Sequence, residues 1–509
     1  MNLIKSTGTF SFFTLISRVL GYLRDVLIAI YLGSGPLADA FFVAFRIPNT
    51  FRRLFSEGSF NAAFVPSYSS ELISSKKNAQ IFANNIFNLL LIGLLVLVLI
   101  IEIFMPWFII LIAPGFKENL EKLELTIYLT RITFPFLLFV SLSSFFAAIL
   151  NTHNKFALSA AVPIVLNILL ILTLLLGKYL NDKLVVYLSY SVTVAGLIQL
   201  ILLVIFSKKF FRANLNFQFK IGKKVKFFFK KLLPSIFSSG VTQINILIGT
   251  IIASFQASAV SYLYYADRIY QINLAIAGIA IGVVVLPQLS KHISNKNKKK
   301  IDLIQNKALE LSLFLSLPAS VALLIAPSEI ISALFGYGQF DEISVLNSAK
   351  ALYYFSFGLP AFAMIKVFSN FFFANHDTKT PFYISLISVL LNVFISIYYF
   401  RSVGFIIIPI ATTISSWVNL IFLFLFLRKN NLFNFNDIFI SRFFKILFSS
   451  ILMGVFFSYL IILFDNQLSF ENSFKSIYLI LSVSLGLAFY LLVTYLIKAF
   501  KLEDIKLKY

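Results

Sequence analysis

Long apolar runs recur along almost the whole of this 509-residue chain, and most of them reach 18 residues or more. A run of about 18 to 20 apolar residues is long enough for a helix to cross the hydrocarbon core of a bilayer. Every backbone polar group inside that core must be paired, and a helix pairs them within one segment. The chain is therefore predicted to be an all-α polytopic membrane protein with about fourteen transmembrane helices.

The expected spans have ends that are uncertain by about two to four residues. In the first half they cover residues 8–30, 38–68, 80–104, 125–150, 157–177, 184–206 and 233–254. In the second half they cover residues 259–290, 303–325, 347–373, 381–400, 404–427, 440–464 and 475–500. The first run carries internal charges and lacks an Ala-x-Ala cleavage site, so we interpret it as a retained helix and not as a signal peptide.

The net charge of +22 is concentrated in alternate loops, which argues against nucleic acid as a partner. The two longest basic stretches, Lys208–Lys231 and Lys291–Lys300, both lie between apolar spans. Phe255–Ala259 and Phe335–Glu342, on the opposite side, contain no Lys or Arg. Basic loops remain on the cytoplasmic side, so both termini are expected to be cytoplasmic. Such loops also contact anionic lipid headgroups, which we expect as partners.

Residues 210–232 differ from the other loops because phenylalanines alternate with lysines there. This composition predicts an amphipathic helix in the cytoplasmic headgroup region. The segment separates two regions that repeat each other. Ala38–Arg46 resembles Val260–Arg268, and three later matches, at Pro66, Asn151 and Asn167, recur at nearly the same offset: the offsets are 222, 221, 224 and 225 residues. An even number of spans separates the matching segments, so the repeats are parallel, an architecture found in transporters.

The expected organisation is thus a six-helix lobe in residues 1–209, a basic amphipathic linker in 210–232, and a second six-helix lobe in 233–430. Residues 431–509 hold two additional helices that the duplication does not explain. No phosphate-binding loop and no cluster of histidines or cysteines is present, so we expect neither catalysis nor a cofactor. Gly278 and Gly282 form a GxxxG pattern, which is typical of close helix packing.

Charged residues inside the apolar spans are the strongest functional signal. Such residues cost about 2.5–3.5 kcal/mol each at bilayer depth, so they usually face an interior or a wet cavity. In span two, the spacing of Asp39, Arg46, Arg53 and Glu57 keeps them on one side of a helix. In span eight, Arg268 occupies the position equivalent to Arg46. The candidate site residues are Ser17, Arg18, Arg24, Asp25, Asp39, Arg52, Arg53, Glu57, Asp267 and Arg268.

These charges have two interpretations. Ion pairs between helices, such as Asp25 with Arg18, Asp39 with an arginine of its own span, or Asp267 with Arg268, would make them structural. However, the arginines outnumber the nearby carboxylates. An excess of cations in a membrane cavity favours an anionic ligand, and the guanidinium group matches phosphate oxygens in a bidentate manner.

Several motifs resemble those of the MurJ (MviN) family of lipid II flippases. They are Ser17–Asp25, Ala38–Asn49, Arg52–Gly58, Ala113–Phe116, Ile149–Thr152, Tyr264–Arg268 and Asp377–Pro381. The resemblance implies the fold of the multidrug/oligosaccharidyl-lipid/polysaccharide exporter superfamily, with two lobes around a cationic cavity and a lipid-tail groove formed by the two additional helices. It also implies that the chain moves lipid II, the undecaprenyl-diphosphate-linked disaccharide-pentapeptide, across the bacterial inner membrane from its inner to its outer leaflet.

By motif, the resemblance assigns substrate binding to Arg18, Arg24, Arg52 and Arg268, with Asp39 and Glu57 as acidic companions. Gln271 departs from the acid that many family members carry there. We expect alternating access by a monomer. A flippase for another polyprenyl-diphosphate glycan remains an alternative. A drug/cation antiporter of the same fold would need an acidic cavity, and a membrane phosphatase or glycosyltransferase would need clustered His or Asp.

Overall fold

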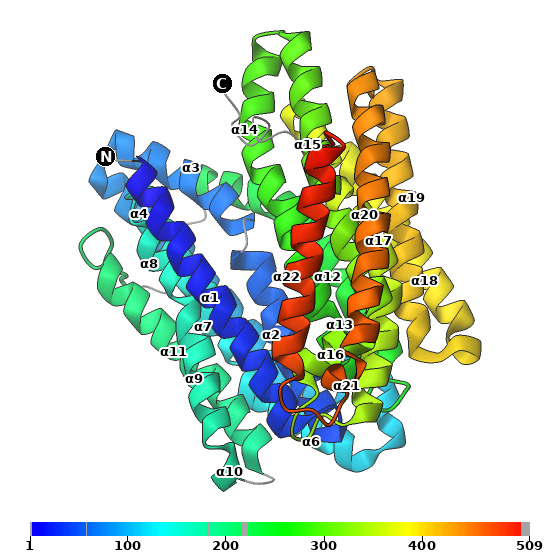
Figure 1. Ribbon diagram of the computed structural model, residues 1–509. Helices are drawn as coiled ribbons and strands as arrows, with labels where there is room; N and C mark the ends of the chain where they lie inside the picture. The colour runs from blue at the N-terminus through cyan, green and yellow to red at the C-terminus, as the bar shows by residue number, and fades with distance from the viewer. Residues whose placement is uncertain (1–2, 57–58, 181–182, 216–221, 500–509) are drawn as a thin grey trace. The chain divides into compact units, whose positions relative to one another are not determined.

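The structure is a computed structural model that describes residues 3–56, 59–180, 183–215 and 222–499. Its regular secondary structure in those ranges is helical throughout (Figure 1). The chain forms two compact units, Met1–Ser261 and Tyr262–Tyr509. Each of the fourteen expected spans corresponds to one helix or to consecutive helices of the structure.

The first unit contains the following elements. They are α1 (Leu3–Leu32), α2 (Pro36–Ser56), α3 (Ser59–Ser74), α4 (Lys76–Ile103), α5 (Met105–Ile112), the 3-10 helix η1 (Pro114–Glu118), α6 (Leu120–Thr133), α7 (Phe136–Thr152), α8 (Phe156–Ala161), α9 (Pro163–Leu175), α10 (Gly177–Leu180), α11 (Leu184–Ser207) and α12 (Lys223–Ala253). The turn that follows α12 leads into α13, whose residues up to Ser261 also belong to this unit.

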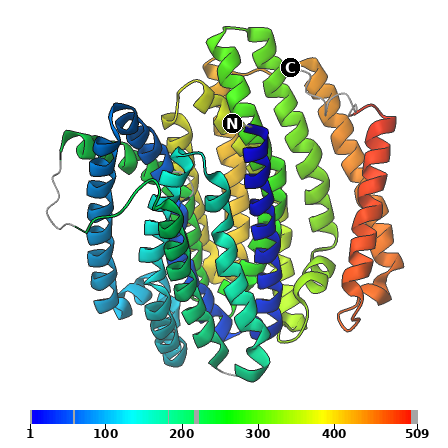
Figure 2. The same cartoon turned by 90° about the vertical axis from the view of Figure 1, so that its left-hand side faces the viewer.

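The second unit continues with these elements. They are α13 (Ala259–Leu274), the π-helix η3 (Ala275–Ala280), α14 (Ile281–Ser294), α15 (Lys298–Ile325), α16 (Pro327–Phe335), α17 (Glu342–Ala374), α18 (Lys379–Val403), the 3-10 helix η4 (Gly404–Ile406), α19 (Ile407–Lys429), α20 (Asp437–Leu463), α21 (Asp465–Leu468) and α22 (Lys475–Leu496). α20 packs on α15 and on α22, and α20 and α22 stand side by side in both views (Figure 2).

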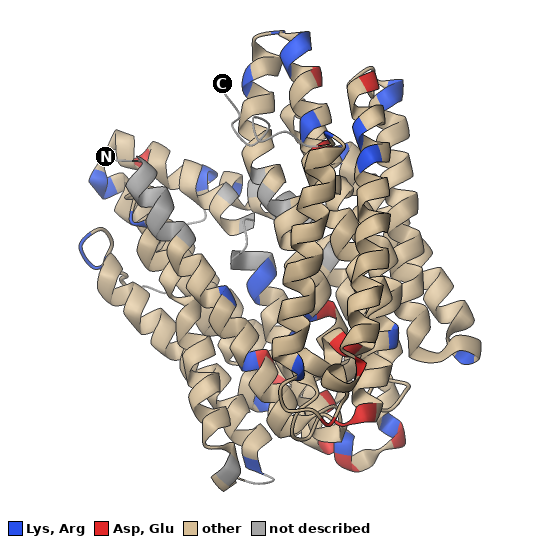
Figure 3. Cartoon of the chain, in the orientation of Figure 1, with Lys and Arg blue, Asp and Glu red and all other residues tan. Residues whose placement is uncertain are grey.

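Nine helical segments among the described residues are long and apolar enough to cross a membrane, and one of these segments joins α18 and α19. α1, α2–α3, α12 and α13–α14 are not among the nine. Three of these four regions carry the intramembrane charges that lower their hydropathy. Figure 3 shows Lys and Arg at the tip of the α14–α15 hairpin, the region of the second unit where the loop charges predict the cytoplasmic side.

The amphipathic segment is not a separate helix, contrary to the expected division at residue 232. α12 begins at Lys223 and continues to Ala253, so the basic segment forms the first turns of span seven. Val225 and Phe228 are buried in an aromatic core with Phe60 and Phe64 of α3. The lysines at 223, 224, 226 and 230 are exposed on the other face of the helix. Phe217 and Phe219 lie outside the described residues.

α12 packs against α2, α3 and α5 of the first unit, so the two compact units divide at Ser261 and not at the linker. The grouping of span seven with the second lobe stays a prediction from the duplication. The aromatic contacts give the physical reason for the observed grouping, because burial of Phe228 beside Phe60 holds the start of α12 on α3.

The duplication is visible in the hydrogen bonds of the two segments that follow α11 and α19. In the first unit, the backbone N–H of Asn214 donates to Asn84 Oδ1 of α4 at 2.7 Å. In the second, the N–H of Asn436 donates to Asn306 Oδ1 of α15 at 3.2 Å. Both pairs are related by the same 222-residue offset found in the sequence. We call this arrangement the asparagine clasp; it attaches the segment before α12 to one unit and the segment before α20 to the other.

Candidate functional site

Arg24 and Asp25 form a buried ion pair on α1. Arg24 Nη2 lies 2.6 Å from Asp25 Oδ1, and Arg24 Nε donates to the same oxygen at 3.0 Å. Arg24 Nη1 donates to Asn167 Oδ1 of α9 at 3.0 Å. Asn167 in turn donates to the carbonyl oxygen of Ser17 at 2.9 Å. The Arg24 guanidinium is therefore held in a fixed orientation by two partners from different helices.

Arg18 lies in a different environment, about 1.7 turns before Arg24 on the same helix. Its side chain is exposed, and it makes no ion pair or hydrogen bond with the described residues. Asp25 pairs with Arg24, so the pairing of Asp25 with Arg18 considered for a structural role is wrong. Arg18 is left as an accessible cation in a predicted membrane span.

The arginines of α2 are partly buried. Arg46 donates to Thr250 Oγ1 of α12, and Arg52 Nε donates to Asn49 Oδ1 at 2.8 Å. The Nε atom of Arg53 is buried and has no hydrogen-bond acceptor among the described residues. Glu57 lies outside the described residues, so its position relative to these arginines stays a prediction. The cationic part of α2 therefore lies in its second half, beyond Arg46.

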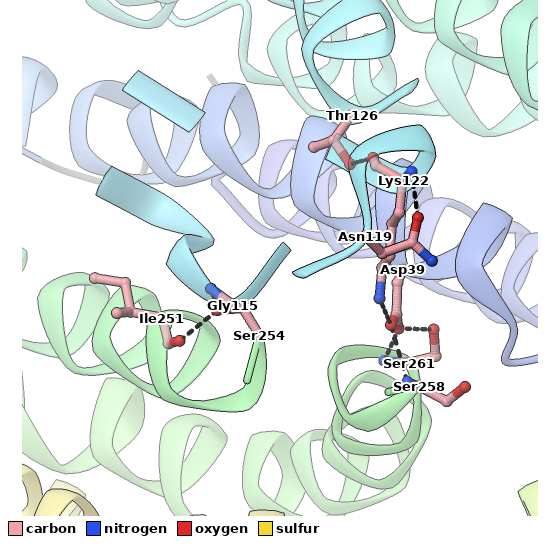
Figure 4. Close-up of polar contacts among 9 residues, drawn as sticks. All are labelled: Asp39, Gly115, Asn119, Lys122, Thr126, Ile251, Ser254, Ser258 and Ser261. Atoms are coloured by element: carbon pink, nitrogen blue, oxygen red, sulfur yellow. Dashed lines mark hydrogen bonds and ion pairs between the residues drawn. The ribbon is translucent and has the colours of Figure 1, made fainter. Parts of the chain in front are cut away.

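Asp39, near the start of α2, is fully buried in a polar network (Figure 4). Lys122 Nζ of α6 lies 2.5 Å from Asp39 Oδ2. The backbone N–H of Ser258 donates to Oδ2 at 3.1 Å, and Ser261 donates to Oδ1 through its N–H at 2.9 Å and its hydroxyl at 2.5 Å. The carboxylate thus caps the first turn of α13, where the helix dipole favours negative charge.

The placement of Asp39 corrects two expectations. Asp39 does not share a wet face of α2 with Arg46 and Arg53, because its side chain has 0% exposure. It also pairs with a lysine 83 residues further along the chain and not with an arginine of its own span. Lys122 was not identified from the sequence as a site residue, since it lies at the polar start of a span where a lysine is common.

A second link lies beside this network in Figure 4. The backbone N–H of Gly115, in η1, donates to Ser254 Oγ at the end of α12 at 3.0 Å. A Cβ atom at position 115 would overlap the backbone of Ser254 and Phe255, so only glycine allows this approach. The turn between α12 and α13 is therefore held at Asp39 and again at Gly115.

The candidate site charges of the second unit, Asp267 and Arg268, lie on α13. Arg268 donates to the hydroxyl of Tyr264 at 2.8 Å, and its guanidinium carbon lies 4.5 Å from the centre of the Tyr264 ring. Gln271 donates to Asp267. The amide of Gln271 is therefore a hydrogen-bond donor to Asp267. Arg268 is oriented by the ring of Tyr264, one turn before it.

The structure brings Ser17, Arg24, Asp25 and Asn167 together in one network and Asp39 with Lys122 in another. Within the described residues, no group of three or more His, Cys, Asp or Glu side chains is placed to hold a metal ion. The two networks join a guanidinium and an ammonium group with carboxylates, an amide and a hydroxyl. Guanidinium groups are strong donors to oxyanions.

These features are those of a multi-helix membrane protein with charged and polar networks among its helices. The fold agrees: a solved structure described as an inward-facing multidrug resistance MATE family transporter of the MOP superfamily is similar over 81% of this chain and 94% of its own, with a TM-score of 0.65 and 16% identity. At that identity the similarity concerns the fold alone.

The chain belongs to the family described as lipid II flippase MurJ, whose model matches residues 28–480. A probable lipid II flippase MurJ of Rickettsia prowazekii is 38% identical over 435 residues, which are 85% of each chain. One of Rhizobium meliloti is 39% identical over 432 residues, 83% of this chain and 80% of its own. A solved structure of lipid II flippase MurJ in an inward closed conformation has a TM-score of 0.82 and 28% identity, covering 96% of this chain and 98% of that one.

Proposed function

We propose that this chain is a flippase that moves lipid II from the inner to the outer leaflet of a bacterial inner membrane by alternating access. Family membership over residues 28–480 supports the substrate. The barrier to flipping is the desolvation of a charged sugar headgroup in the membrane, and a cationic, hydrated site lowers it without any chemical step. The proposed activity is therefore transport without catalysis.

The excess of cations on α1 and α2 carries this proposal. The described parts of α1 and α2 contain two carboxylates, Asp25 and Asp39, and the charge of Asp39 is balanced by Lys122 from α6. The same parts contain five arginines: Arg18, Arg24, Arg46, Arg52 and Arg53. Guanidinium groups bind the oxygens of a diphosphate in pairs. We assign the diphosphate to Arg18, Arg24 and Arg52 and, from the second unit, to Arg268.

The Asp39 network has a role in the alternation. The turn between α12 and α13 contains no Lys or Arg, so the positive-inside rule places it on the outer side of the membrane. In the present conformation, Lys122 and the first turn of α13 are held by the same carboxylate. We infer that this network closes the outer side and separates when the site opens outward.

The two added helices are assigned to the lipid tail. α20 and α22 pack on each other, yet both expose large apolar side chains, among them Val455, Ile462 and Ile480. A polyprenyl chain needs an apolar surface to follow while its headgroup crosses the membrane. Packing alone is the other explanation for such helices, because apolar helices associate readily.

The remaining assignments complete the proposal. The basic loops support a cytoplasmic position for both termini. The exposed lysines at the start of α12, such as Lys223 and Lys226, face anionic lipid headgroups, whereas nucleic acid is not expected to bind. We expect the monomer to be the functional unit.

The test combines binding with growth. The purified protein should bind lipid II more tightly than a polyprenyl-diphosphate carrying an unrelated glycan, and equal binding would favour the alternative flippase. In a strain depleted of its own flippase, Arg24→Gln should abolish growth while the protein still accumulates in the membrane. Arg401→Gln, at an exposed arginine near the end of α18, is the matched control and should support growth. Full growth with Arg24→Gln would contradict the assignment.

A further inference from the structure

Lys366 is a charged residue inside a predicted span that the motifs above do not include. It lies in α17, a helix of 33 residues, eight positions before the last residue, Ala374. At a rise of about 1.5 Å per residue, it is about 12 Å from the end of the helix, well inside the apolar span. α17 is still apolar enough to cross a membrane, because a single lysine lowers the mean hydropathy of a long apolar segment only slightly.

Three other described lysines in spans or at their ends have partners. Lys122 pairs with Asp39, and Lys307 lies 3.6 Å from Glu310. Lys475, which is buried, donates to the carbonyl oxygens of Gly336 and Phe470. Lys366 differs from all three: its side chain is exposed, and it makes no ion pair or hydrogen bond with the residues that the structure describes. A charged side chain without a protein partner is tolerated inside a membrane when it contacts water or an anionic ligand.

The packing of α17 places Lys366 beside the helix that carries Arg268. A Cβ atom at Gly278 would lie 3.1 Å from the Cα atom of Ala363, and one at Gly282 would lie 3.8 Å from the carbonyl oxygen of Lys366. The GxxxG pattern therefore packs on α17, as predicted. Gly278 belongs to the π-helix η3, and short π-helical segments inside α-helices occur frequently at functional sites.

The register of this contact gives the depth of Lys366. Residue numbers rise together along the contact, from Gly278 beside Ala363 to Gly282 beside Lys366, so the two helices run in the same direction. Arg268 precedes Gly278 by ten residues, which is about 15 Å along a helix. α14 ends next to the basic Lys291–Lys300 stretch, so Lys366 lies on the cytoplasmic side of Arg268.

We infer that Lys366 is a substrate-binding residue that captures the diphosphate of the lipid on the cytoplasmic side, before the diphosphate reaches the depth of Arg268. This inference rests on the proposed function. An ammonium group is a compact charge with three donors and no fixed geometry, so it suits a first, loosely oriented contact. Arg268, which stacks on Tyr264, is oriented for the later contact. An accessible cation also raises the rate at which an anionic ligand associates.

The kinetic test uses Lys366→Gln, Lys366→Arg and, as the matched control on the same helix, Lys350→Gln, which also removes an exposed lysine. The association rate constant for lipid II with the purified protein in lipid nanodiscs should fall about tenfold in Lys366→Gln and depend less on ionic strength. Lys366→Arg should restore it, and Lys350→Gln should match the wild type. In transport assays, the half-saturating concentration should rise while the rate at saturation changes little. An unchanged melting temperature separates this effect from a structural one.

A chemical test uses the absence of cysteine from the chain. Lys366→Cys should react with a charged, water-soluble thiol reagent applied to the cytoplasmic side, and lipid II should slow the reaction. Reaction only with a lipid-soluble reagent would show that the side chain faces lipid, and the inference would be wrong. If the wild type does not bind lipid II at all, the proposed function fails. If the wild type binds and Lys366→Gln associates equally fast, only the role of Lys366 fails.

Discussion

Replacing Lys122 with methionine should destabilise the first unit by leaving the Asp39 carboxylate without its cation. Methionine keeps the apolar stem of the side chain and removes only the ammonium group, which lies 2.5 Å from Asp39 Oδ2 and 3.9 Å from the centre of the Phe116 ring. Asp39 is fully buried, and Lys122 is 8% exposed, so water replaces little of the lost interaction. Removing one partner of a buried ion pair costs about 3–5 kcal/mol.

The lower part of that range is expected here. The donors from Ser258 and Ser261 remain, and they still stabilise the ionised carboxylate. About 3 kcal/mol, at about 2–4 °C per kcal/mol for a unit of this size, lowers the melting temperature by about 6 °C or more. The double variant Asp39→Asn with Lys122→Met removes both charges and should be more stable than the two single effects added together predict, because neither charge is then buried alone.

Thermal unfolding of the purified protein in detergent measures these shifts. Lys117→Met, at an exposed lysine in the neighbouring η1, is the control and should change stability by less than about 0.5 kcal/mol. A melting temperature for Lys122→Met that equals that of the control would refute the argument. Additive effects in the double variant would show that the two charges do not interact.

Three further predictions concern topology, pH and the lipid tail. In intact cells, a cysteine introduced at Asn295 should be protected from an impermeant thiol reagent and one at Gln339 should be labelled; the reverse pattern would overturn the orientation. Burial alone would raise the pKa of Asp377, but hydrogen bonds from Thr380 and Lys379 outweigh it and hold that pKa below its ordinary value. The stabilisation from this carboxylate is therefore complete above the unfolded-state pKa of about 3.9, and it is lost as the pH falls through the lower folded pKa. Asp377→Asn should reduce the fall in melting temperature over that pH interval. A pH profile of the melting temperature identical to that of the wild type would contradict this. A photoreactive group on the tail of lipid II should crosslink to α20 or α22, and crosslinks confined to the first unit would exclude the tail groove.

The sequence predicted the helices well because span length and loop charge are local properties. The apolar runs correspond to helices, and the 222-residue repeat reappears in the Asn84–Asn214 and Asn306–Asn436 hydrogen bonds. Span seven was predicted to start at residue 233, ten residues after the observed start of α12 at Lys223. The lysines in the first turns of α12 have the composition of a loop, which caused the difference. Their phenylalanine neighbours pack on α3, which composition alone does not show.

The partners of the charged residues could not be predicted in the same way. A buried carboxylate requires a cation nearby, and the sequence offered several possible cations for each carboxylate. The observed ion pairs, Arg24 with Asp25 and Lys122 with Asp39, depend on how the helices pack. Asn167 was identified only as a marker of the repeat, although its amide orients Arg24. Lys366 was missed because one lysine hardly changes the hydropathy of a long apolar helix.

The asparagine clasp bears on how a chain of this kind acquires helices. The clasp at Asn84 receives the segment that leads into α12, and the clasp at Asn306 receives the segment that leads into α20. Each repeat therefore carries, at its end, an equivalent position that holds the segment which follows it. The attachment of α20 also uses the bundle itself, because Arg442 of α20 donates to the buried Glu310 of α15 at 2.7 Å. On this view α20 and α22 are an addition to the duplicated bundle, held both at the clasp and on α15.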